Sequence, residues 1–231
     1  SKNPKSTELQ KASVLKKAYQ YALSTTSDSL KSKYYSTLSQ NLYITGDSTL
    51  FRKVNKLAIS LNQKQNDSLS IGNAYWDLAL FFHKYSVKDS AYYSYSEAQK
   101  IYEGNGEKQL SGRMYLSMAK IQTEIKDYVG SESTITRAIE RFKPFNDNLN
   151  LYHSYNILGI TLGGLGEVEQ SQSYYKEALY YLKLADFDKV REANIINNIG
   201  VVFRNNKQYK KAIENFRAVL ETDSIELKNP S

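Results

Sequence analysis

The chain contains no cysteine, which excludes disulfide bonds, thiol catalysis and metal sites built on cysteine. Proline is scarce as well, because only Pro4, Pro144 and Pro230 occur, and Pro144 falls late in a predicted helix. Long helices can therefore form over almost the whole chain. No apolar run approaches the roughly 18 residues that a membrane-spanning helix needs. Residues 1–11 are polar and lack the apolar centre of a secretory signal.

The charge is unbalanced but not clustered. Lysine and arginine total 31 against 24 acidic residues, which gives a net charge of +7. The basic residues are scattered, and pairs such as Lys16–Lys17 and Lys210–Lys211 are the longest runs. A nucleic-acid-binding surface is expected to be a clustered basic patch. We therefore interpret the lysines as solvated helix faces and expect no specific contact with nucleic acid, and membrane contact only through flanking segments.

Residue patterns that carry catalysis are also lacking. The two histidines, His83 and His153, have no second metal ligand three or four residues away. The glycine-rich stretch at 163–166 lacks the Lys-Ser/Thr of a phosphate-binding loop, and we interpret it as a turn between helices. No acid, base and nucleophile form a recognisable set. The sequence therefore predicts no enzyme, no metal site and no cofactor.

What the sequence does contain is a fixed period. Four tyrosines follow one another at intervals of 40 residues, and a column of alanines keeps the same interval. Such a period indicates stacked copies of one structural unit rather than a single globular core. The two columns are Tyr35, Tyr75, Tyr115 and Tyr155, and Ala18, Ala58, Ala98, Ala138 and Ala178.

The clearest copy of this unit lies between residues 193 and 220. Its apolar and small residues form one stripe on a first helix and another on a second helix. This pattern resembles the tetratricopeptide repeat, although the period here is 40 or 41 residues instead of 34, so each helix should be about one turn longer. The matching residues are Ile196, Ile199, Gly200, Phe203, Ala212, Phe216 and Val219.

The same register runs back through copies that begin on Tyr155, Tyr115, Tyr75 and Tyr35. The resemblance implies an all-α, right-handed superhelical solenoid of antiparallel helix pairs, with about five repeats and an N-terminal half repeat. The half repeat is expected at 5–26 and the repeats at about 30–65, 70–104, 108–144, 148–185 and 189–222. We expect one continuous solenoid over 1–231 that is a fragment of a longer protein.

Two features of the repeats allow further expectations. Asn55 and Gln122 stand where the pattern expects apolar residues, so their repeats should pack less well. Aspartates in the turns can cap the following helix, because their carboxylates accept from its free amides. Among these residues are Asp47, Asp67, Asp127 and Asp147.

The resemblance also implies where a ligand binds. In tetratricopeptide repeats the first helices line a concave groove that takes short peptides or partner helices. The expected lining is rich in amide and basic side chains, which suits a peptide of acidic character, and Trp76 is the best single anchor. The alternative is a merely solvated face. The candidate ligand-binding residues are Asn73, Trp76, His83, Lys84, Arg113, Lys120, His153, Asn156, Asn197 and Arg204.

From the resemblance we expect a non-catalytic protein- or peptide-binding module, the sensor or interaction region of a bacterial signalling or transcriptional regulator. The segment would then be extracytoplasmic, and a homodimer is left open. The alternative is a free-standing scaffold or chaperone adaptor in the cytoplasm. A downstream output domain would separate the two.

Overall fold

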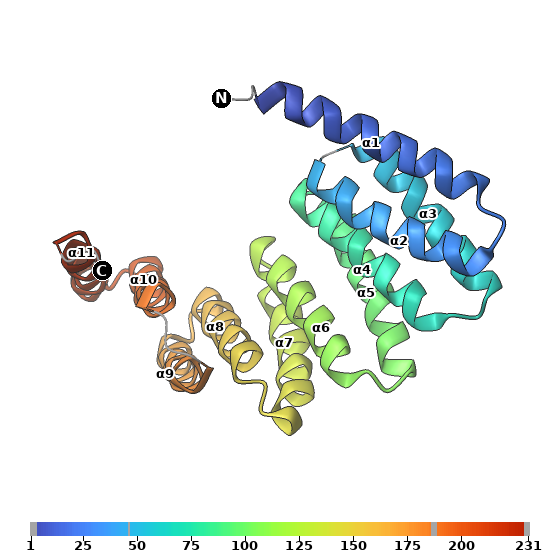
Figure 1. Ribbon diagram of the computed structural model, residues 1–231. Helices are drawn as coiled ribbons and strands as arrows, with labels where there is room; N and C mark the ends of the chain where they lie inside the picture. Colours follow the sequence, from blue (N-terminus) through green and yellow to red (C-terminus); the bar gives the residue numbers. More distant parts are fainter. Residues whose placement is uncertain (1–3, 46, 186–188, 229–231) are drawn as a thin grey trace. The chain divides into compact units, whose positions relative to one another are not determined.

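The computed structural model of the chain describes residues 4–45, 47–185 and 189–228. Over these ranges the chain forms α-helices joined by short turns, with one short 3-10 helix and no β-strand (Figure 1). The predicted all-α class and the stacking of helix pairs are confirmed. The chain divides into two compact units, the first ending at Glu107 and the second beginning at Lys108.

The first unit contains a single helix followed by two helix pairs. Each pair is antiparallel because its turn is short, and α2 also touches α4 along the stack. Its core includes the stacked rings of Phe51 and Phe81, whose centroids lie 4.3 Å apart. The helices are α1 (Pro4–Ser24), α2 (Asp28–Thr45), α3 (Ser48–Lys64), α4 (Ser68–Lys84) and α5 (Lys88–Gly104).

The second unit contains three helix pairs. Within it α8 contacts α6 on one side and α10 on the other, so the first helices of successive pairs are neighbours. The helices are α6 (Lys108–Glu124), α7 (Tyr128–Phe142), α8 (Asn148–Leu165), α9 (Val168–Ala185), α10 (Lys189–Asn205) and α11 (Tyr209–Lys228), with the 3-10 helix η1 (Lys143–Phe145) after α7.

Most of the alanine column lies in the cores of the two units. Ala58, Ala98, Ala138 and Ala178 are buried, and Ala138 and Ala178 lie in the larger cluster of the second unit. The glycine of the first helix allows the close approach that the pattern predicts. A Cβ added at Gly159 would lie 2.8 Å from the ring of Tyr175. Because Tyr175 is fully buried, this ring has little room to move.

A hydroxyl of the second helix joins the two helices of a pair in the second unit. Ser131 donates to the carbonyl oxygen of Ala119 at 3.1 Å, and Ser171 donates to that of Gly159 at 2.7 Å. These serines occupy equivalent positions 40 residues apart, and both are buried. The bond satisfies a hydroxyl that would otherwise be costly to bury.

The turns repeat every 20 residues, at half the period of the sequence. In seven of the described turns, though not in the turn between α1 and α2, a residue has left-handed backbone, and the next amide donates back to a carbonyl five residues earlier, as from Asp127 to Gln122 at 2.8 Å. This is the Schellman arrangement, which satisfies the last carbonyls of a helix. A helix of about 17 residues plus such a turn explains the long period. The left-handed residues are Asn66, Ser86, Gly106, Lys126, Asn146, Gly166 and, one residue later, Lys207.

The predicted aspartate caps are present. Asp47, Asp67, Asp127 and Asp147 each accept from an amide three residues on, at 3.0 to 3.3 Å. The Ser70 side chain lowers the pKa of Asp67, and the amide bond from the same residue lowers it further, because both favour the charged carboxylate. Asp67, Asp127 and Asp147 directly follow a left-handed residue, so one short turn both ends a helix and starts the next.

Two details differ from the sequence expectation. Pro144 does not lie in the helix, because α7 ends at Phe142 and Pro144 lies in η1. A proline lacks the amide that would continue the helix and disfavours helical backbone in the residue before it. In the glycine-rich stretch only Gly166 lies in the turn, while Gly163 and Gly164 belong to the last turn of α8. A Cβ added at Gly164 would meet the ring of Tyr128 at 2.4 Å, so these glycines allow close packing.

Candidate functional site

The ten candidate residues all lie on the first helices of their pairs, where the register places them. They divide into two groups, one in each compact unit. In the first unit they lie on α4: Asn73, Trp76, His83 and Lys84. In the second unit they lie on α6, α8 and α10: Arg113, Lys120, His153, Asn156, Asn197 and Arg204.

Two candidates of the first unit already have partners within that unit. The Lys84 ammonium donates to the backbone oxygen of Tyr43 at 2.8 Å and lies 4.7 Å from the centre of its ring. Lys84 therefore ties α4 to α2. The ring of His83 is half-buried and lies edge-on to that of Tyr95, 6.4 Å away. Both residues are accounted for by packing between helices.

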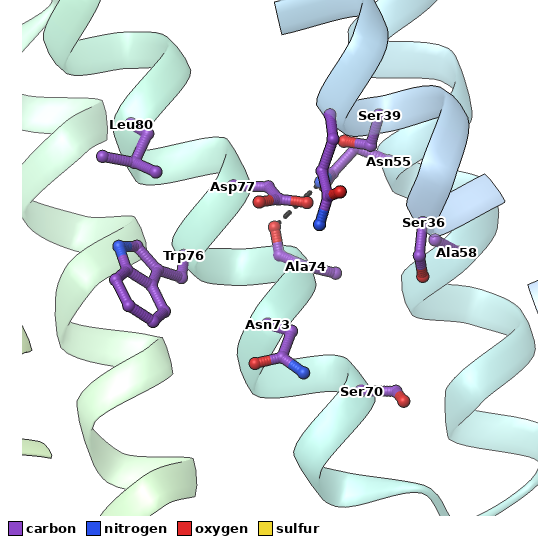
Figure 2. Close-up of a pocket in the computed structure, with 11 residues that line it drawn as sticks. Ser36, Ser39, Asn55, Ala58, Ser70, Asn73, Ala74, Trp76, Asp77 and Leu80 are labelled. Atoms are coloured by element: carbon purple, nitrogen blue, oxygen red, sulfur yellow. Dashed lines mark hydrogen bonds between the residues drawn. The ribbon is translucent and has the colours of Figure 1, made fainter. Parts of the chain in front are cut away.

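Asn73 and Trp76 meet the buried Tyr102 of α5. The Tyr102 hydroxyl donates to Asn73 Oδ1 at 2.8 Å, and the Trp76 ring lies edge-on to the Tyr102 ring at 6.3 Å. Trp76 is half-buried. In Figure 2 its ring extends from α4 on a different side from the carboxyl group of Asp77.

A cavity of about 400 Å³ lies between α2, α3 and α4 of the first unit (Figure 2). Seven of its eleven lining residues are polar, and all of them belong to helices described above. One carboxylate, Asp77, lines it, and its lining includes no lysine, arginine or histidine. The lining residues are Ser36, Ser39, Gln40, Asn55, Ala58, Ser70, Asn73, Ala74, Trp76, Asp77 and Leu80.

Two buried oxygen atoms in the wall of this cavity lack hydrogen-bond partners in the structure. Asn55 and Ser39 are each 1% exposed, and the atoms concerned are Asn55 Oδ1 and Ser39 Oγ. The Asn55 amide nitrogen donates to the carbonyl oxygen of Ala74 at 2.8 Å, which ties α3 to α4 (Figure 2). Most buried polar atoms in proteins are hydrogen-bonded, so two such oxygens in one cavity need an explanation.

The environment of Asp77 favours its neutral form. Burial raises the pKa of its carboxyl group to about 6, and the nearby Ser39 hydroxyl offsets only part of this rise. Ser39 lies close to the carboxyl group but outside regular hydrogen-bond geometry. Burial also raises the pKa of the Tyr102 phenol, and the charge of Asp77 adds to that rise. A carboxyl group that lines a cavity and has a pKa raised toward neutral pH is typical of functional sites.

In the second unit, positive charge gathers around His153 of α8. Burial lowers the pKa of this imidazole, and the charges of Arg191 on α10 and Lys120 on α6 lower it further, while Asp147 partly opposes them. Three neighbouring first helices therefore contribute to one basic surface. We call the exposed and half-buried residues Arg113, Lys120, His153, Asn156, Arg191, Asn197 and Arg204 the basic face of the second unit.

Asparagine side chains also lie on the basic face of the second unit. Asn198 on α10 donates to Asn156 on α8 at 3.1 Å. The predicted Asn197 is exposed and lies beside this pair in the chain. Arg204 donates to the side chain of its neighbour Asn205 at 3.3 and 3.4 Å, and Arg113 is exposed. The amides and the basic groups thus lie on one row of helices.

Sequence reasoning missed five residues that matter to these surfaces. Asn55 carried a signal, because a polar residue stood where an apolar one was expected. Ser39, Asp77, Arg191 and Asn198 carried none, since their roles depend on which helices become neighbours. Asp77 in particular is partly buried at a place where α2 and α3 both pack beside α4.

The part of the chain that the structure describes holds neither a metal-binding cluster nor a membrane-spanning helix. No group of three or more histidine, aspartate or glutamate side chains lies close enough to hold a metal ion there. In the same part of the chain, no helix combines the length and apolar character needed to cross a membrane.

Comparisons with known proteins agree with the repeat architecture. Residues 152–189 and 193–225 match the family model described as tetratricopeptide repeat. No curated protein sequence matches the chain. Among solved structures, BtubC (BKLC) from P. vanneervenii is 17% identical with a TM-score of 0.76, over 97% of this chain and 92% of that one.

Two further structures are similar in fold. Aspartyl phosphate phosphatase F from Bacillus subtilis is 14% identical with a TM-score of 0.67, over 90% of this chain and 64% of that one. YrrB, described as a TPR protein with an unusual peptide-binding site, is 15% identical with a TM-score of 0.57, over 82% of this chain and 84% of that one. At such identities the likeness concerns the fold alone.

Proposed function

The chain is a tetratricopeptide repeat protein, and from this premise we propose that it is a protein-binding module whose second unit holds an acidic peptide segment. The observation that carries the proposal is the basic face. Lys120, His153 and Arg191 come from three successive first helices, and the two cations are near enough to lower the histidine pKa. The peptide-binding site named for YrrB, which shares the fold, supports the same class of ligand.

The chemistry of the face suits a peptide with carboxylate side chains. Arginine and lysine pair with carboxylates, and arginine can do so with two parallel hydrogen bonds. Asparagine amides such as Asn156 and Asn197 can both donate to and accept from a peptide backbone. The arrangement therefore combines charge recognition with backbone recognition on one row of helices.

A peptide selection tests this proposal. A displayed random peptide library would be selected on the whole chain, and we expect the selected peptides to be enriched in aspartate and glutamate. Their affinity would then be measured by fluorescence anisotropy at two ionic strengths. Binding should weaken as salt rises, because salt screens pairs that are open to solvent.

Charge reversal locates the site. The double variant Arg113→Glu/Lys120→Glu should weaken binding of a selected peptide about tenfold or more, because like charges then face each other. The control Lys176→Glu/Arg217→Glu makes the same change in net charge on exposed residues of the second helices α9 and α11. Equal losses in the two variants, or selected peptides without acidic residues, would contradict the proposal.

We also propose that the module is the sensor or interaction region of a bacterial regulator. The support is the resemblance of its long, roughly 40-residue repeats to those of such regulators. The test is the sequence of the parent gene on both sides of the segment. A kinase or DNA-binding domain downstream would support this role, whereas a stop codon after the repeats would favour the free-standing scaffold.

A further inference from the structure

The cavity between α2, α3 and α4 presents hydrogen-bond acceptors from three different helices. Ser39 comes from α2, Asn55 from α3 and Asp77 from α4 (Figure 2). This cavity belongs to the first unit and shares no residue with the basic face of the second unit. An inference about it is therefore independent of the acidic-peptide proposal.

The orientation of the Asn55 amide is fixed by its neighbour. The carbonyl oxygen of Ala74 can only accept a hydrogen bond, so the amide nitrogen must face it at 2.8 Å. The amide oxygen is then left over, buried and without a partner in the cavity wall. A buried carbonyl-type oxygen in this position is completed by a donor, not by an acceptor.

The other two groups point to the same kind of ligand. When it is ionised, the Asp77 carboxylate can only accept hydrogen bonds, and the buried Ser39 oxygen beside it still has lone pairs available. Although the chain as a whole carries a charge of +7, its basic residues contribute nothing to the lining of this cavity. A negative group and two unpaired oxygens thus lie in an otherwise neutral hollow.

We propose that this cavity binds a primary ammonium group, which donates to Asp77, Asn55 Oδ1 and Ser39 Oγ. An ammonium carries three N–H donors and no acceptor, which matches three acceptor groups from three helices. Its charge compensates the Asp77 carboxylate, and its donors satisfy the two orphaned oxygens. The ammonium comes either from a free amine or from a lysine side chain of a bound peptide, and the experiment distinguishes these sources.

The test uses four small probes on the whole chain, one of which is a blocked arginine for comparison. Nα-acetyl-lysine-N-methylamide carries the ammonium on a blocked lysine, and n-butylamine carries it on a free amine. The norleucine derivative with the same blocking groups lacks the ammonium. Trp76 is the single tryptophan and lines the cavity, so its indole N–H resonance and the Asn55 side-chain amide resonances report binding by NMR.

We expect saturable shifts of these resonances with both ammonium probes and none with the norleucine derivative. Tighter binding of the lysine derivative than of butylamine would identify a peptide side chain as the source, and equal binding would identify a free amine. Shifts of equal size with norleucine would overturn the proposal. So would tighter binding of the matching blocked arginine, because it would assign the site to a guanidinium.

Variants test the roles of the three acceptors. Asp77→Asn keeps the shape of the side chain and should weaken binding of the lysine derivative at least about tenfold, because a charged hydrogen-bond partner is lost. Ser39→Ala should weaken it severalfold, since one acceptor is removed. Asp89→Asn, an exposed carboxylate on α5, is the matched control and should leave the affinity unchanged. An unchanged affinity in a folded Asp77→Asn protein would overturn the assignment.

The pH dependence gives a second readout. The groups that face Asp77 are the Ser39 hydroxyl of α2 and the Tyr102 phenol of α5, and neither carries a charge near neutral pH. Affinity for the ammonium probes should therefore fall as pH is lowered through about 6, where Asp77 gains its proton. The Asp77→Asn protein should lack this change, and the same change in both proteins would count against the site.

Discussion

At the scale of single residues, the two departures from the repeat pattern are buried polar groups. Asn55 and Gln122 are 1% and 7% exposed, and each makes one hydrogen bond, to Ala74 and to Asp127 respectively. Each also leaves its side-chain oxygen buried without a partner. A buried polar atom without a partner lowers the stability of the fold by roughly 1–3 kcal/mol, so each departure is destabilising for this reason.

Asp77 should make the stability of the protein depend on pH. Its pKa of about 6 in the folded state exceeds the ordinary value of 3.8, so the folded chain keeps a proton that the unfolded chain loses. The stabilisation is complete below about pH 4 and is lost as pH rises through 6. Asp77→Asn should therefore raise the free energy of unfolding above pH 6, by at most about 3 kcal/mol.

Urea unfolding at pH 4, 5, 6 and 7 measures this effect. The original chain should lose stability relative to Asp77→Asn across that range, and the difference should vanish near pH 4. Glu132→Gln, on an exposed position of α7, serves as the control and should run parallel to the original chain. A constant difference between the original chain and Asp77→Asn at all four pH values would contradict the prediction.

At the scale of the elements, the turns combine a helix end and a helix start in three residues. Several of their left-handed positions hold residues other than glycine, including Ser86 and Lys126 with φ of 59° and 63°. A side chain with a Cβ is strained there, at a cost of about 1–2 kcal/mol. The regular hydrogen bonds of the turn hold these residues in place in spite of that cost.

Lys126→Gly should therefore stabilise the protein, whereas Lys126→Ala should not. Both variants remove the same charge, so their difference isolates the backbone conformation. We expect the glycine variant to exceed the alanine variant by about 1 kcal/mol in the free energy of unfolding, because glycine adopts φ near 63° without strain. Chemical denaturation of both variants in one buffer measures this, and equal midpoints would refute the explanation.

Some features of the turns could be predicted from the sequence, and others could not. The aspartate caps could be predicted because a carboxylate before a helix has a local role, as at Asp67. The left-handed turn residues could not, because Lys126 and Ser86 carry no turn signal of their own. The same limit applies to the sites: the register placed Lys120 and His153 on first helices, but the burial of Asp77 depends on the neighbouring helix.

At the scale of the whole molecule, each unit is a row of helix pairs that touch mainly their neighbours. In such arrays the free energy of unfolding is approximately the sum of the stabilities of the single repeats and of the interfaces between neighbouring repeats. A destabilising substitution should therefore affect mainly its own repeat and the adjacent ones. Gly159→Val tests this, because the added side chain would collide with the fully buried Tyr175. Overpacking of this kind costs roughly 1–3 kcal/mol.

Hydrogen exchange would show the extent of the damage. In Gly159→Val, protection should fall in α8 and α9 and in the helices beside them, while α2 to α5 keep theirs. Gly104→Ala is the control: no atom lies within 4 Å of the added Cβ, so exchange should not increase. A uniform loss of protection along the chain in Gly159→Val would show that the array unfolds as one block.

The spacing of the turns also constrains how such a gene can grow. A duplication of 20 residues would preserve the spacing of the turns. It would, however, exchange first and second helices downstream, so that the buried alanines would no longer stand on second helices. A duplication of 40 residues preserves both. Insertions and deletions that this coding sequence tolerates should therefore come in whole pairs of helices, so that binding faces are gained or lost one entire segment at a time.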